Sequence, residues 1–224
     1  LSNHNIFGFC VATEDEVLEL VQNKISKPIL HLGKIDPSNY NIFKFDNVRC
    51  TLNDLTDISI LESYSKKLSK KIKCHIKVDT GMNRMGLKFH DFKENINLIM
   101  KNQHLDVEAV YSHLACSSES ESKQNIEQIE KFKLCIDLMS SHNEVKYHLL
   151  STSGIFNFND NIYDFARSGL SIYGASSLGE INENLRPAME LKAPIKLIKN
   201  IEKGETIGYG ATYTAKKDMK IGII

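Results

Sequence analysis

Short apolar segments alternate with amphipathic segments along most of this chain, and that alternation is the strongest constraint on its fold. The apolar segments have the length of buried strands, and the segments between them place apolar side chains at helical spacing. Strands linked by helices in this way pair in parallel, through crossover connections. The predicted strands lie within residues 6–12, 28–33, 47–52, 74–79, 105–115, 145–151 and 162–174.

Seven strand–helix units are compatible with a closed barrel or with an open sheet. They indicate a (β/α)8 TIM-type barrel that lacks its first strand in this chain, and the alternative is an open doubly wound sheet. No Gly-x-Gly-x-x-Gly sequence opens the first predicted helix, which disfavours a dinucleotide-binding sheet. We therefore predict an α/β barrel over residues 1–180.

The predicted helices have recognisable starts and apolar stripes. Thr13 and Glu16 have the spacing of a capping box at the start of the first helix. Asn53 or Asp54 is the predicted cap of a later helix. The apolar stripes of three helices are Leu55, Ile58, Leu61 and Leu68; Phe92, Ile96, Ile99 and Met100; and Ile126, Ile129, Phe132, Ile136 and Met139.

The pattern changes after Gly174. Residues 176–187 are predicted to form a linker, and residues 189–197 then alternate between apolar and mostly polar side chains. That period is typical of an antiparallel strand with one buried face. We expect residues 181–224 to be the beginning of a C-terminal, mainly antiparallel β domain.

The two ends of the sequence suggest a piece of a longer protein. Residues 202–205 read as a turn between strands, and residues 206–215 and 219–224 read as two more strands. The chain stops inside the last of these runs, and it opens at Leu1 without an initiator methionine. We expect the β domain to be truncated here.

Composition and charge exclude several classes of function. Lys+Arg and Asp+Glu both number 28, so nothing suggests a nucleic-acid surface or a polybasic membrane patch. No apolar run approaches the ~18 residues that a membrane span needs, and no signal peptide opens the chain. The 5 cysteines show neither a CxxC pair nor metal-ligand spacing, which favours reduced thiols in a cytoplasmic protein without a metal site.

One predicted strand carries polar side chains that a buried strand does not normally hold. In CHIKVD (74–79), His75, Lys77 and Asp79 share one face, and the three apolar side chains share the other. The outer face of a barrel strand packs on helices, so the polar face must line the lumen. Asp79 then lies at the C-terminal end of its strand, where barrels of this type carry their chemistry.

Other predicted strands also place polar residues near their C-terminal ends. Taken singly, each has a plainer explanation: a satisfied core histidine, a surface ion pair or turn chemistry. Their convergence at corresponding strand ends favours a site, and the small and hydroxyl residues among them suit a phosphate. They are His113, His148, Ser151, Thr152, Ser153, Arg167 and Gly169.

Four segments together resemble the alanine racemases: IKVDTGMNRMG, VYSHLA, FARSGLSIYG and GETIGYGATYTA. Their order and spacing match over about residues 6–224, and DTGMNRMG and GYGATY are the most specific parts. The resemblance implies a pyridoxal-phosphate-dependent isomerase, built as a (β/α)8 barrel followed by a β domain. Such a cytoplasmic homodimer with shared active sites racemises L- and D-alanine, or a similar small amino acid, and supplies D-alanine for peptidoglycan.

The resemblance also implies roles for barrel residues. Arg84 resembles the arginine that binds the substrate carboxylate and hydrogen-bonds the catalytic tyrosine. Lys77 resembles a lysine that is often carbamylated and then orients this arginine; burial favours the neutral amine that captures CO₂. Arg167 resembles the arginine facing the pyridine nitrogen, which would stay unprotonated because arginine keeps its protons. His113 would hold Arg167 in place.

Further residues follow from the same resemblance. Tyr209 resembles the catalytic tyrosine, the acid/base for one face of the substrate bound to the partner subunit's cofactor. Gly169 and Leu170 would offer backbone donors to the phosphate. The family has Asn-Ser where this chain has Ser-Thr at 151–152, so either Thr152 or Ser153 is the predicted hydroxyl donor to phosphate.

The family's cofactor-bearing lysine, which is also the base for the other face, has no counterpart in this sequence. We therefore expect the chain to begin at the second barrel strand, and a protein of only these residues to be inactive. Three alternatives are a non-enzymatic pyridoxal-phosphate-binding barrel protein, a decarboxylase and a metal-dependent hydrolase. The strand pattern after residue 189, together with Tyr209, disfavours the non-enzymatic barrel protein. Arg167 disfavours the decarboxylase, and the absence of an HxH pair at a strand end disfavours the hydrolase.

Overall fold

A computed structural model describes residues 4–38, 41–161, 163–176 and 184–224 of the chain. The chain divides into two compact units, Leu1–Arg186 and Pro187–Ile224. The predicted domain boundary between residues 180 and 181, and most of the predicted linker, lie outside the described residues, so that boundary stays a prediction.

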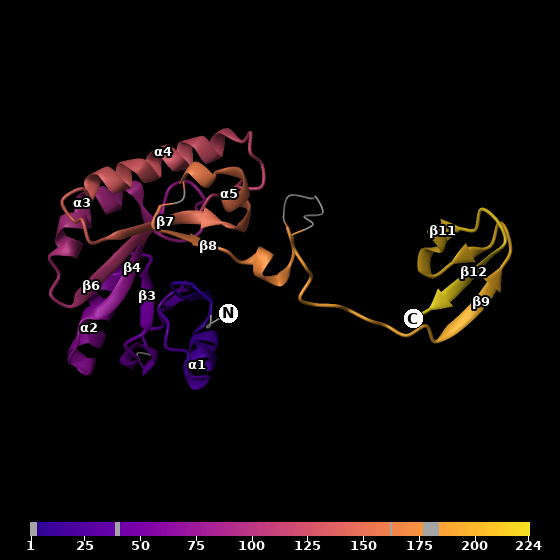
Figure 1. Cartoon of the computed structure of the whole chain (residues 1–224), viewed down its shortest axis with the longest axis horizontal. Coiled ribbons are helices and arrows are strands. Elements are labelled where there is room, and N and C mark those ends of the chain that lie inside the picture. Colours follow the sequence, from indigo (N-terminus) through magenta and orange to yellow (C-terminus); the bar gives the residue numbers. More distant parts are fainter. Residues whose placement is uncertain (1–3, 39–40, 162, 177–183) are drawn as a thin grey trace. The chain divides into compact units, whose positions relative to one another are not determined.

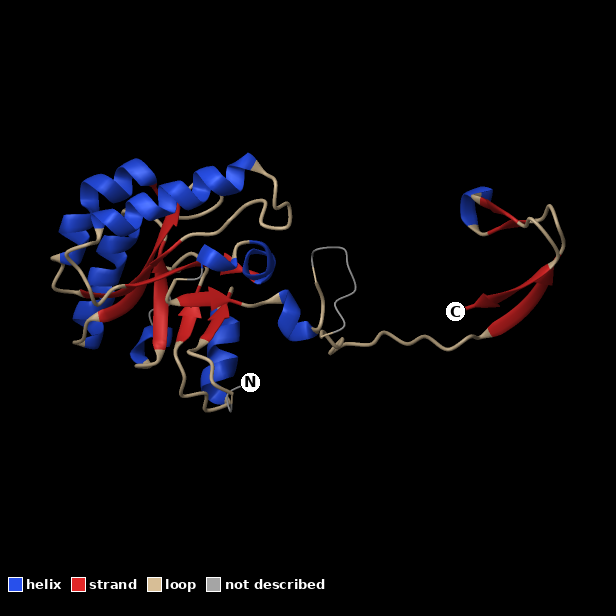
Figure 2. Ribbon diagram, turned by 45° about the horizontal axis from the view of Figure 1, so that its top comes forward, coloured by secondary structure: helices blue, strands red, loops and turns tan. Residues whose placement is uncertain are grey.

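The first unit is a curved parallel sheet flanked by helices (Figures 1 and 2). Seven strands follow one another across it in chain order, and each pairs in parallel with the next. A short eighth strand, β5 (Leu87–Lys88), pairs with β4. The seven are β1 (Phe9–Val11), β2 (Ile29–His31), β3 (Val48–Leu52), β4 (Ile72–Asp79), β6 (Leu105–Tyr111), β7 (Lys146–Ser151) and β8 (Phe165–Arg167).

The first and last strands of this sheet lie near each other. Phe7, just before β1, packs on Phe165 of β8 with 4.2 Å between the ring centroids. Burial raises the pKa of the Cys10 thiol in β1, and the charge of Arg167 in β8 opposes that rise. No ladder joins β1 to β8 among the described residues. The sheet is therefore a nearly closed barrel, which confirms the predicted fold class.

The helices between these strands pack their apolar stripes on the sheet. Val17, Leu61, Phe92 and Phe132 are all fully buried, as helical spacing predicts. Full burial of an apolar side chain of this size stabilises the fold by roughly 1.5–3 kcal/mol. The helices are α1 (Glu14–Gln22), α2 (Thr56–Leu68), α3 (Phe89–Met100), α4 (Lys123–Leu138) and α5 (Thr152–Asn157), with the short 3-10 helices η1 (Asn41–Lys44), η2 (Asn159–Asn161) and η3 (Leu170–Tyr173).

The predicted stripe of α4 is wrong at Ile126, which is 55% exposed. The buried face of this helix instead runs through Asn125, Gln128, Ile129, Phe132 and Cys135. Two polar residues occupy the core-facing positions because their amides satisfy loop carbonyls. Apolarity alone therefore misassigns the face.

The predicted helix starts are correct for α1 and displaced for α2. Thr13 Oγ1 accepts the Glu16 N–H at 3.3 Å and Glu16 Oε2 accepts the Thr13 N–H at 2.9 Å, a complete capping box. Leu55, and neither Asn53 nor Asp54, is the cap residue of α2. Asp54 Oδ1 still accepts the Thr56 N–H at 2.8 Å, and Asp57 in the first turn reaches back to accept both the Asn53 and the Asp54 N–H.

The second unit consists of two small antiparallel sheets. β9 (Leu197–Ile201) pairs with β12 (Met219–Ile223), and β10 (Thr206–Ile207) pairs with β11 (Tyr213–Thr214). The 3-10 helix η4 (Tyr209–Ala211) connects the latter two strands.

The predicted strand over residues 189–197 is wrong, because the strand begins only at Leu197. Leu197 pairs with Ile223, the last residue of β12, so the preceding residues have no described strand to pair with. Met189 and Leu191 are 81% and 100% exposed. Alternation makes a segment able to join a sheet, but backbone pairing makes it a strand.

None of the described helices combines the length and the apolar composition that crossing a bilayer requires.

Candidate active site

The guanidinium of Arg167 is the centre of a buried polar cluster at the ends of β6, β7 and β8. Its Nη1 lies 2.7 Å from Nδ1 of His148, and its Nη2 lies 3.1 Å from Nδ1 of His113. Nη2 also donates to the carbonyl oxygens of Ser112 (2.7 Å) and Leu149 (2.9 Å). These contacts fix the guanidinium plane against two neighbouring strands.

The charges in this cluster follow from its geometry. A guanidinium can only donate hydrogen bonds, so both histidines accept through an unprotonated Nδ1 and are neutral. Burial and then the charge of Arg167 lower the pKa of His113 to about 4 and hold that of His148 well below its usual range. Burial also lowers the pKa of Arg167. The Nε–H of Arg167 and the second hydrogen of Nη1 donate to no described residue, so these directed donors are left over.

Tyr111 has its ring close to both cations of the cluster, Lys77 and Arg167. Its ring stacks on the His148 ring, with centroids 4.6 Å apart and planes 7° from parallel. The Arg167 guanidinium carbon and Lys77 Nζ lie 5.2 and 5.6 Å from its centroid, and its hydroxyl lies 3.0 Å from Thr51 Oγ1. Sequence reasoning missed Tyr111, although its position two residues before His113 places both on one strand face.

Lys77 faces the lumen, as the alternation along β4 predicts. The residue is 7% exposed, and no described carboxylate lies within ion-pair distance of its ammonium. Burial, together with the charges of Arg84 and Arg167, lowers the pKa of Lys77 to about 8. A substantial fraction of the Lys77 side chain is therefore the neutral amine at a pH slightly above 7.

The DTGMNRMG turn is braced by Asp79. Asp79 Oδ1 accepts the N–H groups of Gly81 (3.0 Å) and Asn83 (2.9 Å), and Oδ2 binds Lys88 Nζ at 2.8 Å. Burial raises the pKa of Asp79, but these bonds more than offset it and the net shift is downward. Asp79 thus has a structural role: it holds the turn that carries the exposed Arg84.

Gly86 brings the end of this turn back onto β4. It has a φ of 114°, and a Cβ there would lie 3.0 Å from the Lys77 carbonyl oxygen and 3.0 Å from the Asp79 nitrogen. Only glycine meets both requirements without strain.

The predicted phosphate-binding residues come together from two segments. Thr152 and Ser153 begin α5 and are 5% and 8% exposed. Thr152 Oγ1 accepts the Gly169 N–H at 2.9 Å, so that donor is engaged within the protein. A Cβ on Gly169 would meet only Thr152 Oγ1, at 4.0 Å, and Leu170 next to it opens η3. The backbone at this corner is therefore open to close approach by a ligand.

Tyr209 belongs to the second unit, where it opens η4 and is fully exposed. Gly208 and Gly210 on either side both have a φ of 74°, a left-handed conformation that explains the Gly-Tyr-Gly sequence. The structure brings the other predicted site residues together in the first unit, and the part of Tyr209 stays a prediction.

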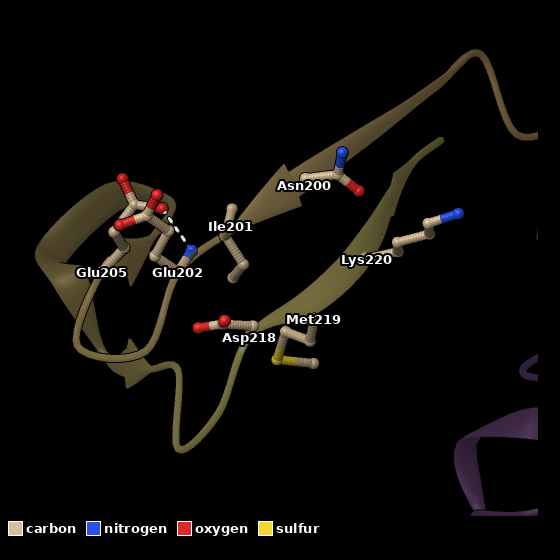
Figure 3. Close-up of a pocket in the computed structure, with 7 residues that line it drawn as sticks. All are labelled: Asn200, Ile201, Glu202, Glu205, Asp218, Met219 and Lys220. Carbon is tan, nitrogen blue, oxygen red and sulfur yellow. Dashed lines mark hydrogen bonds between the residues drawn. The ribbon is translucent and has the colours of Figure 1, made fainter.

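A hollow of about 670 Å³ in the second unit holds none of the predicted site residues (Figure 3). Its carboxylates serve the local backbone: Glu205 Oε2 accepts the Glu202 N–H at 2.7 Å and Asp218 Oδ1 accepts the Lys203 N–H at 2.9 Å. Within the described ranges, no group of three or more His, Cys, Asp or Glu side chains is arranged to hold a metal ion.

The fold and the cluster together define a (β/α)-barrel protein with a cationic, histidine-supported site at its strand ends. The alanine racemase N-terminal domain profile matches residues 1–177, and the alanine racemase C-terminal domain profile matches residues 188–224. The chain belongs to the alanine racemase family.

Individual relatives agree with this assignment. The alanine racemase of Vesicomyosocius okutanii is 32% identical over 200 residues, which cover 88% of this chain and 54% of the relative. That of Streptococcus pyogenes serotype M5 is 32% identical over 223 residues, covering 97% of this chain and 60% of the relative. The chain thus spans a little over half the length of these relatives.

Solved structures share the fold. The alanine racemase of Clostridium difficile 630 is 27% identical, with a TM-score of 0.80 over 96% of this chain and 58% of its own. That of Bartonella henselae, with covalently bound pyridoxal phosphate, is 22% identical, with a TM-score of 0.80 over 97% of this chain and 60% of its own. At that identity, the second comparison supports the fold alone.

Proposed function

We propose that this chain forms part of an enzyme that racemises L- and D-alanine, or a similar small amino acid, with pyridoxal phosphate. The family and the relatives support the reaction, and the described site residues fit the cofactor. The non-enzymatic carrier is not favoured, because such proteins lack a β domain and residues 188–224 match the racemase C-terminal domain.

The observation that carries the proposal is the hydrogen-bonding of Arg167. Its terminal nitrogens are committed to His148, His113 and two carbonyl oxygens, while Nε–H is uncommitted among the described residues. A rigid donor without an acceptor fits an unprotonated pyridine nitrogen. Because the guanidinium does not release its proton, the ring nitrogen stays neutral.

The other end of the cofactor fits the corner between α5 and η3. Thr152 and Ser153 bring a buried hydroxyl pair and the first N–H groups of α5, which lack acceptors within the helix. Gly169 and Leu170 bring backbone that no side chain obstructs at Gly169. We assign Thr152, Ser153 and the Leu170 backbone as donors to the phosphate, whereas Gly169, whose N–H is bound by Thr152 Oγ1, only allows the close approach.

Bound there, pyridoxal phosphate supplies an electron sink for the electron pair left when the substrate Cα loses its proton. Arg84 binds the substrate carboxylate. Lys77, once converted to a carbamate anion, pairs with Arg84 and orients it, which replaces the present repulsion between the two cations by attraction.

Tyr209 is the proposed acid/base at one face of Cα. His113 is proposed to keep Arg167 in place. No residue of this chain is assigned as the base for the opposite face. We extend the proposal to a homodimer with sites shared between subunits, in which Tyr209 serves the partner's site. A cytoplasmic role in supplying D-alanine for peptidoglycan is in keeping with five free cysteines.

The test is racemisation by the complete encoded protein. With saturating pyridoxal phosphate and L-alanine, D-alanine should accumulate, as measured by a D-amino-acid oxidase assay. Arg167→Gln should lower kcat by about 10²-fold or more, the usual effect of removing one directed donor. Arg186→Gln, at an exposed position of the same unit, is the matched control. No D-alanine from the wild-type protein would overturn the proposal.

A further inference from the structure

A β-bulge in β6 lies at Glu108, beside His75 of β4. Cys74 of β4 lies opposite Val107 of β6, but His75 lies opposite Ala109, so Glu108 is skipped in the register. An extra residue of this kind bends its strand and redirects its side chain. In a regular ladder His75 would lie directly opposite Glu108; the bulge instead pairs His75 with Ala109 and leaves Glu108 between the partners of Cys74 and His75.

The Glu108 carboxylate is held by two basic side chains of β3 and β4 and lies near His75. Arg49 of β3 binds it through two bonds, Nε to Oε2 at 2.8 Å and Nη2 to Oε1 at 3.0 Å. Lys73 Nζ lies 3.6 Å from Oε1 and His75 Nε2 lies 3.8 Å from Oε2. Burial raises the pKa of Glu108, but contacts with His75 and Arg49 outweigh it and lower the pKa to about 2. The carboxylate is therefore an anion beside His75 at neutral pH.

Two hydrogen bonds link His75 to Arg167 through His148, and they have only one consistent direction of proton donation. Arg167 donates to Nδ1 of His148, so the proton of neutral His148 is on Nε2. That proton points at Nδ1 of His75, 3.0 Å away, which must accept it. Neutral His75 then carries its own proton on Nε2, the nitrogen that faces Glu108.

We propose that Glu108 and His75 are positioning residues for Arg167: the carboxylate fixes the His75 tautomer, and His75 fixes His148 as the acceptor of the guanidinium. This deepens the proposed racemase function and rests on it. If the hydrogen bond between His75 and His148 ran in the other direction, His148 would carry its proton on Nδ1. That proton would face an N–H of Arg167, and the contact would be repulsive. We call this chain of contacts from Glu108 through His75 and His148 to Arg167 the relay. The relay keeps the plane of the Arg167 guanidinium fixed and leaves its Nε–H available for the cofactor.

The relay predicts tautomers that are measurable without cofactor or substrate. In the complete encoded protein labelled with ¹⁵N-histidine, the NMR signals of His75 and His148, assigned by His75→Gln and His148→Gln, should be those of neutral rings protonated on Nε2. Glu108→Gln should shift the His75 signals and, through them, those of His148. Asp106→Asn, an exposed carboxylate on the same strand, should leave both unchanged.

Kinetics of the holoenzyme give a second readout. Glu108→Gln should lower kcat by about tenfold, the lower end of the range for residues that orient a functional group from behind. KM for alanine should stay within twofold, because Arg84 binds the carboxylate. His75→Phe should match this loss, whereas His75→Gln, which retains an acceptor oxygen, should recover part of it. Thermal unfolding checks that each variant is folded.

Failure of the relay is distinguishable from failure of the proposed function. Wild-type racemisation with unchanged tautomers and unchanged kcat in Glu108→Gln would overturn the relay and leave the racemase intact. Tautomers other than Nε2-protonated in the wild-type protein would also overturn it. The tautomer experiment decides the relay even if no D-alanine is formed.

Discussion

Carbon dioxide should add to Lys77 in preference to Lys73, the lysine that shares its strand and its face. The reaction needs a neutral amine: the nitrogen lone pair bonds to the carbon of CO₂, one N–H proton leaves, and a carbamate anion remains. Lys77 is 7% exposed and meets two cations, whereas the Lys73 side chain is 37% exposed and lies 3.6 Å from the Glu108 carboxylate.

The pKa of Lys77 sets how much of its amine is neutral, and therefore able to react with CO₂, compared with an ordinary exposed lysine. A fall from 10.5 to about 8 raises the neutral fraction at pH 7 from about 0.0003 to about 0.1, roughly 300-fold. Once formed, the carbamate gains the attraction of Arg84 in place of the repulsion that the ammonium experiences. Both effects favour the modified lysine.

The assay is ¹³C NMR of the protein in ¹³C-bicarbonate between pH 6 and pH 9. One carbamate carbon should appear with its midpoint near the pKa of Lys77, disappear in Lys77→Met and persist in Lys73→Met. A signal that survives Lys77→Met, or a Lys77 pKa above 10 measured by titration, would refute the reasoning about burial and the neighbouring cations.

Three further outcomes are expected. Tyr209→Phe should lose most Cα proton exchange in D₂O that starts from one enantiomer of alanine; equal loss from both would contradict a one-face role. Thr13→Ala should cost about 1 kcal/mol in urea unfolding by removing the cap of α1, and an unchanged midpoint would contradict it. The stability that Glu108 contributes is present above pH 4.5 and lost as pH falls toward 2, so the destabilisation caused by Glu108→Gln should shrink between pH 7 and pH 3; a constant difference would contradict this.

Local features of the chain were predictable where a local rule decides them. The period of two along β4 placed Lys77 in the lumen, because the side-chain direction of a strand is set by its own backbone. The capping box of α1 was predictable for the same reason, since Thr13 and Glu16 are within one turn of each other. The resemblance to the family added roles that no such rule supplies.

Features that depend on pairing were not predictable. The register shift that pairs His75 with Ala109 and leaves Glu108 outside the ladder arises between two strands, so neither the β4 nor the β6 sequence alone predicts it. The strand expected at 189–197 fails because alternation cannot say whether a partner backbone is present. Tyr111 and His148 acquire their roles only through the cation and the ring packed against them.

The sequence by itself determined the alternation of strands and helices, the inward face of β4 and the family. Only the tertiary structure decided the partners of Arg167, which come from positions 18 to 55 residues away along the chain. It also decided that Thr152 binds the Gly169 N–H, and the direction of each hydrogen bond in the relay. The physical reason is that local backbone geometry sets where a side chain points, whereas packing between strands sets what it meets.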